Sequence, residues 1–340
     1  MLPCGRAKPG RWCSCWSDAR AGRQVPDWAI IGGNRANQED PISQPVTPGA
    51  DAGSGGNDPV RADPGGAFAG DPAAAGPGHS FAAAEAGWLG VLGRLRDVVR
   101  QEVLRSQLAG LPQLRRPGAR VLDVGCGQGT QALHLARAGH AVTGLDSSAA
   151  LLAEFEAALG AEPAEVAARV RLIRGAGENA PDLVDSAFDV VLCHGVLMYL
   201  GDITPMLTAL SEVTDAGGAI SLLVRNGLAT AMRDGLRGNW PAALAAFDRR
   251  DYVNRLGLRA RAHVPAEVDQ VLAPLGWQRR EWFGVRVFTD HLDEPAPDPA
   301  TAAGLLAAER EAGRRDPYRS VAALLHLVYG QVRANAGDDI

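Results

Sequence analysis

Apolar residues change their spacing along the chain, and these changes predict its elements. In the first part of the chain no period is visible, and Ala, Gly, Pro, Asp and Asn dominate. From Trp88 to Leu108 apolar residues recur at helical spacing, which predicts amphipathic helices over residues 79–112. Short apolar runs then alternate with helical patterns, which is typical of an α/β fold. We therefore expect a disordered tail over residues 1–78 and one domain over residues 79–340.

Residues 121–146 are organised as a strand, a glycine-rich turn, a helix and a second strand. The turn carries three glycines, and the second strand ends at Asp146. Glycines let the backbone pass close to a ligand because no Cβ stands in the way. A carboxylate at the position of Asp146 accepts both hydroxyls of a ribose. The stretch predicts the nucleotide-binding half of a doubly wound α/β sheet.

The spacing of the glycines separates two classes of cofactor. The dinucleotide fingerprint is G-x-G-x-x-G, whereas this chain has Gly125-x-Gly127-x-Gly129. Asp123, two residues before the first glycine, would repel a pyrophosphate but suits a cofactor with a sulfonium and an ammonium group. The stretch resembles motif I of class I S-adenosylmethionine (SAM) methyltransferases, which implies SAM as cofactor and a seven-stranded, mostly parallel sheet. The alternative is a Rossmann-type domain that binds no SAM.

The rest of the chain continues the alternation of helices and strands. A helix N-cap is expected at Ser147-Ser148, and a glycine C-cap at residues 215–218. Residues 227–262 form an arginine-rich insertion, which we assign to the substrate. We expect helices at 149–159, 203–213, 264–275 and 299–314, and strands at 170–174, 188–193, 219–224, 279–288 and within 322–334. The two last strands predict an antiparallel hairpin that closes the sheet.

His194 directly follows the buried strand 188–193. Ligands bind beyond the carboxyl ends of such strands, so we expect His194 beside the cofactor. The alternative is a structural histidine.

Charge and cysteine content exclude few of the possible functions. The net charge of −5 gives no global basic field that would draw the protein to nucleic acid. No apolar run is long enough for a membrane span, and no signal-peptide core follows Met1. Cys4, Cys13 and Cys15 lack a fourth ligand for zinc, so we expect no metal. Five cysteines, two of them near the candidate site, favour a reducing cytoplasm.

A narrower resemblance covers about residues 89–332. The segments that carry it are 93–96, 122–129, 193–197, 273–277, 284–290, 315–319 and 324–328. They resemble the bacterial tRNA 5-carboxymethoxyuridine methyltransferases, and the family esterifies the carboxylate of a modified uridine in the anticodon loop with SAM. The resemblance and motif I together imply these cofactor-binding residues: Arg96, Asp123, Gly125, Cys126, Gly127, Asp146, Gly177, Glu178 and His194. Residues 197–199 depart from the family pattern, which often has an acid and a tryptophan there.

A carboxylate acceptor favours an arginine fork that holds it in line with the methyl group. Arg286, expected on the strand 279–288, is our candidate catalytic residue, with Arg225 second and Asn226 and Tyr318 as supports. From Arg225 to Arg286 eleven arginines stand against six acids, which favours tRNA as partner. The alternatives are a methyltransferase of a small metabolite and a SAM-binding module without catalysis.

Overall fold

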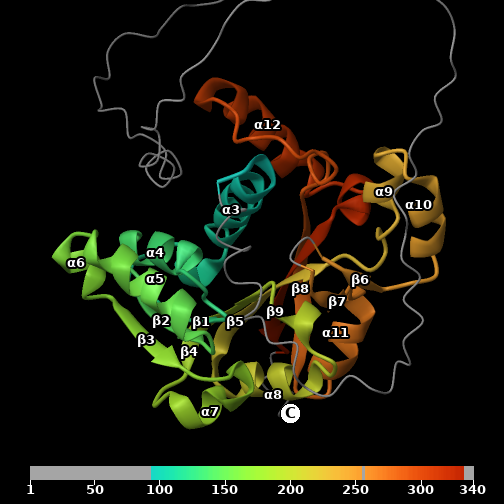
Figure 1. Ribbon diagram of the computed structural model, residues 1–340. Helices are drawn as coiled ribbons and strands as arrows, with labels where there is room; N and C mark the ends of the chain where they lie inside the picture. Colours follow the sequence, from blue (N-terminus) through green and yellow to red (C-terminus); the bar gives the residue numbers. More distant parts are fainter. Residues whose placement is uncertain (1–92, 255–256, 333–340) are drawn as a thin grey trace, which may run out of the picture. The chain divides into compact units, whose positions relative to one another are not determined.

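The structure is a computed structural model that describes residues 93–254 and 257–332 (Figure 1). The expected tail over residues 1–78 and the first part of the expected helical run lie outside the described residues. Within the described residues, no helix is both long and apolar enough to cross a membrane.

One seven-stranded sheet forms the centre of the domain, as the sequence predicts. Its order is β3-β2-β1-β4-β5-β9-β8. The first five strands of this order are parallel, and β9 runs antiparallel to both of its neighbours. The strands are β1 (Arg120–Val124), β2 (Ala141–Asp146), β3 (Val170–Arg174), β4 (Phe188–His194), β5 (Thr214–Arg225), β8 (Trp277–Val285) and β9 (Leu324–Gln331).

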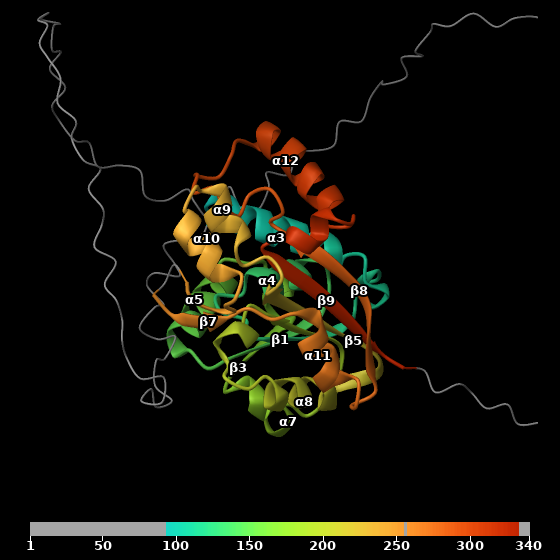
Figure 2. The same ribbon diagram turned by 90° about the vertical axis from the view of Figure 1, so that its right-hand side faces the viewer.

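Helices cover both faces of the sheet, because its strands are apolar on both sides (Figures 1 and 2). One face packs against α3 (Leu95–Leu108), α4 (Thr130–Arg137), α5 (Ala149–Gly160), α6 (Ala164–Ala167) and α12 (Pro299–Ala312). The other packs against α7 (Ala180–Leu183), α8 (Thr204–Glu212) and α11 (Pro265–Leu272). Val121 and Leu122 are both fully buried, yet they belong to the two different apolar clusters. This alternation is what the two-residue period of a strand demands.

Local signals in the sequence set several helix boundaries. Ser148 caps α5, and its Oγ accepts a hydrogen bond from the backbone N of Leu151 at 3.1 Å. Pro265 is the first residue of α11, where its missing N–H costs no hydrogen bond. Short 3-10 turns stand at Pro112–Leu114, Gly177–Asn179, Leu197–Tyr199 and Tyr318–Val321.

Two boundary predictions are wrong. Residues 215–218 are not a helix cap but the start of β5, which begins at Thr214 and pairs with β4 across a bulge. Arg120 stabilises this start by ion pairs with Asp189 and Asp215. The strand expected over residues 279–288 ends at Val285, and Arg286 is not part of it.

The insertion over residues 227–262 contains two short helices and a hairpin. The helices are α9 (Met232–Leu236) and α10 (Trp240–Ala246), and they lie side by side (Figures 1 and 2). The hairpin pairs β6 (Asp251–Val253) with β7 (Arg259–Arg261) in a separate two-stranded sheet. The sequence predicted helical patches here but not the hairpin.

Candidate functional site

A cavity of about 480 Å³ lies at the carboxyl ends of β1, β2 and β4. We call it the cofactor cavity. The structure brings eight of the nine predicted cofactor-binding residues to its wall: Asp123, Gly125, Cys126, Gly127, Asp146, Gly177, Glu178 and His194. The remaining one, Arg96, does not line it.

The glycine turn between β1 and α4 depends on conformations that only glycine adopts without strain. Gly125 and Gly127 have φ angles of 73° and 56°. A Cβ on Gly125 would lie 2.2 Å from Cγ2 of Val196, so a side chain would also clash there. The N–H of Gly127 donates to Oδ2 of Asp146, and the N–H of Ser148 donates to Oδ1, both at 2.8 Å. Asp146 thus ties the turn to the end of β2.

Asp123 is a buried carboxyl group in the wall of the same cavity, and only 4% of the residue is exposed. Burial, and secondarily the charge of Asp146, raises the pKa of Asp123 to about 7. A cation in the cavity would stabilise the ionised form of such a group. The pair of acids therefore favours a cationic ligand.

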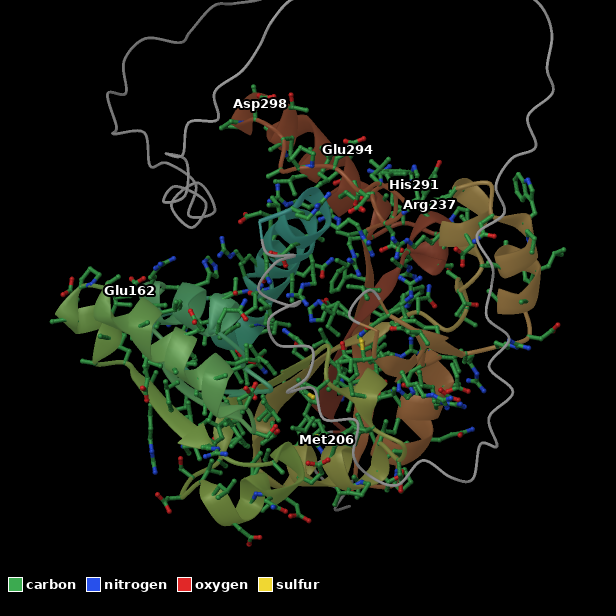
Figure 3. All side chains as sticks on the ribbon, viewed as in Figure 1. Glu162, Met206, Arg237, His291, Glu294 and Asp298 are labelled. Carbon is green, nitrogen blue, oxygen red and sulfur yellow. The ribbon has the colours of Figure 1, made fainter. Side chains whose placement is uncertain are left out.

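The loop after β3 closes another part of the cofactor cavity. A Cβ on Gly177 would lie 2.5 Å from Cγ1 of Val124 and 2.6 Å from Cε of Met206, which Figure 3 labels on α8. The loop can pack this closely because residue 177 is glycine. Glu178 follows it as a half-buried acid in the wall.

The two cysteines near the site are buried free thiols. Burial is the main cause that raises the pKa of both Cys126 and Cys193. A thiol with a raised pKa is a poor nucleophile, so Cys126 contributes its place in the turn rather than its sulfur chemistry.

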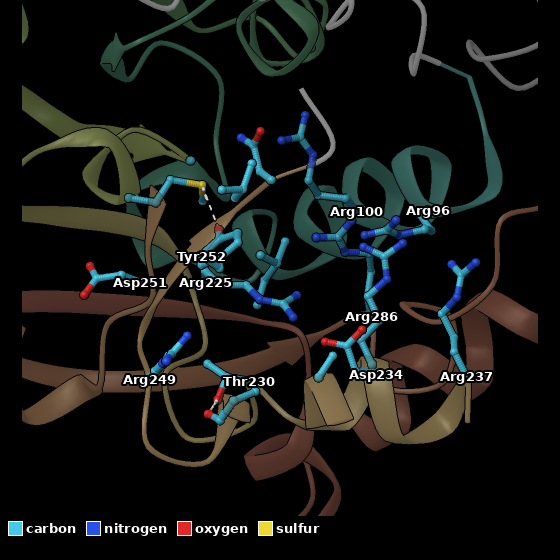
Figure 4. A pocket seen from close by; sticks show the side chains of 18 of the residues that line it. Arg96, Arg100, Arg225, Thr230, Asp234, Arg237, Arg249, Asp251, Tyr252 and Arg286 are labelled. Atoms are coloured by element: carbon cyan, nitrogen blue, oxygen red, sulfur yellow. Dashed lines mark hydrogen bonds between the residues drawn. The ribbon is translucent and has the colours of Figure 1, made fainter. Parts of the chain in front are cut away.

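A second cavity, of about 750 Å³ (Figure 4), shares lining residues with the first. We call it the arginine cavity. Its walls come from α3, the end of β5, the insertion and Arg286. Four residues line both cavities: Arg100, Gly195, Tyr199 and Leu223. The two cavities therefore meet at this shared wall.

Three guanidinium groups converge on Asp290 in and behind the wall of the arginine cavity. Arg96 Nη2 lies 3.0 Å from Oδ1, Arg225 Nη1 lies 3.1 Å from Oδ2, and Arg286 Nε lies 3.5 Å from Oδ1. Arg286 Nε makes no hydrogen bond to any described residue. Figure 4 shows the guanidinium groups of Arg96, Arg100 and Arg286 close together. Three guanidinium groups around one carboxylate favour the binding of a further anion.

The titration of the cluster follows from its burial and its charges. Burial, then the neighbouring arginines Arg96, Arg225 and Arg100, lowers the pKa of Arg286 to about 9, although Asp290 opposes the shift. Burial acts to raise the pKa of Asp290, but the arginines outweigh it and hold this pKa well below its usual range. Asp290 is therefore ionised near neutral pH, and Arg286 is charged but electrostatically crowded by other cations.

A buried acid on α12 holds the loop that carries Arg286 and Asp290. Glu309 is 1% exposed. Its carboxylate accepts hydrogen bonds from the backbone N of Val287 at 2.8 Å and of Phe288 at 3.0 Å, and from Oγ1 of Thr289 at 2.7 Å. Arg286 is the first residue of this loop and has a left-handed φ of 61°. Our prediction that a strand presents Arg286 is wrong, because a tethered loop presents it.

Three other predicted residues lie elsewhere than expected. Arg96 lines the arginine cavity, whereas Arg100, one turn further along α3, reaches both cavities. The side chain of Asn226 is engaged with the backbone of Ser320, Ala322 and Leu228. Tyr318 is half exposed, packs against the ring of Phe288 and lines neither cavity.

Sequence reasoning missed Asp290, Glu309 and Tyr252. Tyr252, on β6 of the insertion, lines the arginine cavity, and the guanidinium of Arg225 lies 5.9 Å from the centre of its ring. The segment 284–290 already contained Asp290, four residues after Arg286, and an acid at that spacing was the available signal. Glu309 gave no local signal, because its partners lie about twenty residues earlier.

The chain is similar to known methyltransferases. Residues 122–222 match the family described as Methyltransferase domain. A tRNA 5-carboxymethoxyuridine methyltransferase of Escherichia coli is 29% identical over 238 residues, which cover 70% of this chain and 90% of that protein. A ubiquinone biosynthesis O-methyltransferase of Vibrio atlanticus is 34% identical over 119 residues, 32% of this chain and 45% of that protein.

Among solved structures, magnesium protoporphyrin IX methyltransferase from Synechocystis PCC 6803 is similar with a TM-score of 0.45 and 18% identity, covering 70% of this chain and 85% of that one. The observed sheet order, the matched domain and the sequence relatives all point to one class of enzyme. Together they show that the chain is a class I SAM-dependent methyltransferase.

Proposed function

We propose that the protein methylates a carboxylate, and that its substrate is tRNA carrying 5-carboxymethoxyuridine, which becomes the methyl ester. The observation that carries this proposal is the cluster of Arg96, Arg225 and Arg286 around Asp290, in a cavity that adjoins the cofactor cavity. A carboxylate is the anion that a guanidinium fork holds in a defined orientation. The printed function of the Escherichia coli relative supports the same acceptor.

The lining of the cofactor cavity supports SAM as the ligand, because its carboxylates can accept hydrogen bonds from the hydroxyl and ammonium groups of SAM. We assign Asp146 to the ribose hydroxyls, Asp123 to the positive charge of the methionine part, and the turn at Gly125, Cys126 and Gly127 to close backbone approach. Gly177 and Glu178 form the wall for the adenine. Arg96 stays our predicted partner of the methionine carboxylate, although the structure shows it bound to Asp290.

The chemistry asks the protein for alignment rather than for a base. Bound SAM supplies an electrophilic methyl group on a sulfonium. A carboxylate has a pKa of about 4 and is already ionised near neutrality, so no side chain has to remove a proton. Arg286 and Arg225 hold the acceptor oxygens, and Glu309 and Asp290 hold the loop and the guanidinium groups in place. Orientation of this kind supplies a large part of the rate of such transfers.

The insertion supplies the outer wall of the arginine cavity. Arg233, Arg237, Arg249 and Tyr252 line it there. Arginines at such a position can contact phosphates, and an aromatic ring can stack on a base. We therefore assign the insertion over residues 227–262 to the nucleic-acid part of the substrate.

The direct test is nucleoside mass spectrometry. tRNA from a strain without the gene should lack the methyl ester and accumulate the free acid, and the gene should restore the ester. Purified protein with SAM should convert this tRNA in vitro, while Arg286→Ala should not. Arg280→Ala is the matched control, since Arg280 is an exposed arginine on β8 that lines neither cavity. Methylation of a small acid but not of tRNA would show instead that the protein is a methyltransferase of a small metabolite. SAM binding without any methyl transfer would indicate a non-catalytic SAM-binding module.

A further inference from the structure

Beneath α3, side chains from three neighbouring strands form a continuous hydrogen-bond chain that begins at the cofactor cavity. His194 Nε2 lies 2.9 Å from Ser221 Oγ, which lies 2.7 Å from His326 Nε2. His326 Nδ1 lies 2.9 Å from Oε1 of Gln107, and Nε2 of Gln107 donates to the carbonyl of Gly284 at 3.4 Å. Ser221 and His326 have no exposed surface.

The sheet register brings these side chains to one face. Leu223 on β5 lies opposite His194 on β4 and opposite His326 on β9. Ser221 precedes Leu223 by two residues, so its side chain points to the same face and stands between the two histidines. The helix α3 covers this face and contributes Gln107.

The carbonyl of Gly284, at the end of the hydrogen-bond chain away from the cavity, fixes which atom donates in each of its hydrogen bonds. The carbonyl of Gly284 can only accept, so Gln107 donates to it and offers its own oxygen to His326 Nδ1–H. Burial lowers the pKa of His326 to about 3, which keeps the ring neutral and leaves its Nε2 as an acceptor. The hydroxyl of Ser221 therefore donates to His326, and its oxygen accepts from Nε2–H of His194.

With these hydrogen-bond directions, Nδ1 of His194 carries no proton and has a free lone pair. Burial, then His326 and Arg100, holds the pKa of His194 well below its ordinary value, so the ring carries no charge. No described residue hydrogen-bonds to Nδ1. A buried lone pair without a donor costs less than a buried N–H without an acceptor, which agrees with the deduced tautomer.

We propose that the chain of Ser221, His326 and Gln107 locks His194 as its neutral Nε2–H tautomer, and that these three are positioning residues of the cofactor cavity. The ring of His194 in the cavity wall then carries no positive charge. This suits a cofactor that carries a sulfonium and an ammonium group, because an imidazolium would repel both. The proposal rests on the SAM site assigned above.

The tautomer is measurable without any turnover. Long-range ¹H–¹⁵N correlation spectra of protein with labelled histidines should show the Nε2–H pattern for His194 and the Nδ1–H pattern for His326. In Ser221→Ala, His194 should show a mixture of both tautomers, whereas Ser221→Thr, which keeps the hydroxyl, should retain the single pattern. Isothermal titration should give a SAM affinity about tenfold weaker for Ser221→Ala and near wild type for Ser221→Thr.

Ser211→Ala is the matched control, because it removes a hydroxyl that accepts from Trp277 on the other side of the sheet. It should leave the SAM affinity and the His194 spectrum unchanged. Should Ser221→Ala fail to fold, Gln107→Leu breaks the chain from the helix and should free the tautomer of both histidines. An Nδ1–H pattern for wild-type His194 would overturn the proposal. An unaltered tautomer and SAM affinity in a folded variant whose hydrogen-bond chain is broken would overturn it too. Since neither readout uses an acceptor, failure of the tRNA assignment would leave this result standing.

Discussion

The cofactor cavity and the arginine cavity are built in opposite ways. Much of the wall of the first comes from one continuous stretch of 26 residues, 121–146, in which each residue is placed by the strand, turn or helix next to it. The cluster in the second joins α3, the end of β5 and the loop after β8, and the pair Arg96–Asp290 spans 194 residues of sequence. The first is a product of local structure and the second of tertiary packing.

The two cavities also differ in charge. Asp123, Asp146 and Glu178 line the cofactor cavity, whereas the cluster around Asp290 has more arginines than acids. A cationic methyl donor and an anionic acceptor would each meet the opposite charge and come together at the shared wall. The comparison predicts that variants on one side change one binding step and leave the other alone.

The largest effect should come from Arg286. Arg286→Ala removes one cation from a buried cluster, so turnover of the carboxylate acceptor should fall by about 100-fold or more. Arg286→Lys should fall less, because it keeps the charge but loses the planar fork. Any residue other than glycine meets the same left-handed backbone at this position, so strain does not distinguish the variants. Initial rates and titration with SAM measure both steps.

In the same experiment, SAM affinity should stay within about twofold of wild type. Arg280→Lys, on the strand β8 that precedes Arg286, should change neither quantity. A parallel loss of SAM affinity in Arg286→Ala would show that the two cavities act as one site.

What the sequence predicted and what it missed follow the same division. The sheet and the strand–turn–helix unit at the glycines depend on patterns within a few residues, and both predictions are confirmed by the structure. The prediction that Arg286 lies on a strand was wrong. The apolar residues after Val285 resemble a strand, but the N–H groups of Val287 and Phe288 donate to Glu309 instead of to a neighbouring strand. The histidine chain was equally invisible, since Ser221 and His326 meet only through sheet pairing.

The next effect tests the cofactor side alone. Asp146→Asn keeps the size of the side chain but removes its charge and one acceptor, so SAM affinity should fall by about 10- to 100-fold. Calorimetry measures the affinity, and thermal melting controls for the two turn hydrogen bonds that Asp146 accepts. Asp182→Asn, at an exposed acid of α7, should have no effect. Unchanged affinity in a folded Asp146→Asn protein would remove Asp146 from the SAM site.

A smaller effect should appear as a pH dependence. The pKa of Asp123 is raised to about 7, and bound SAM should lower it by favouring the ionised form. Binding below this pKa must therefore release a proton, so SAM affinity should rise as the pH increases from 6 to 8, by about tenfold at most per unit. In Asp123→Asn the rise should vanish. Calorimetry in buffers with different ionisation enthalpies counts the released proton directly, and a wild-type count of zero at pH 6 contradicts the assignment.

The smallest effect should come from replacing Cys126. This variant distinguishes the role of its backbone in the turn from any role of its thiol. The sulfur lies close to Gly144 in the core, and burial, together with the two neighbouring acids, raises its pKa. Cys126→Ala should therefore bind SAM within about twofold of wild type and lose about 1 kcal/mol of stability from the missing sulfur contacts. Iodoacetamide should label this thiol in the unfolded protein but not in the folded one. If iodoacetamide labelled the folded protein rapidly and SAM blocked this labelling, the thiol would face the ligand. The side chain of Cys126, which we assign to packing, would then contribute to SAM binding.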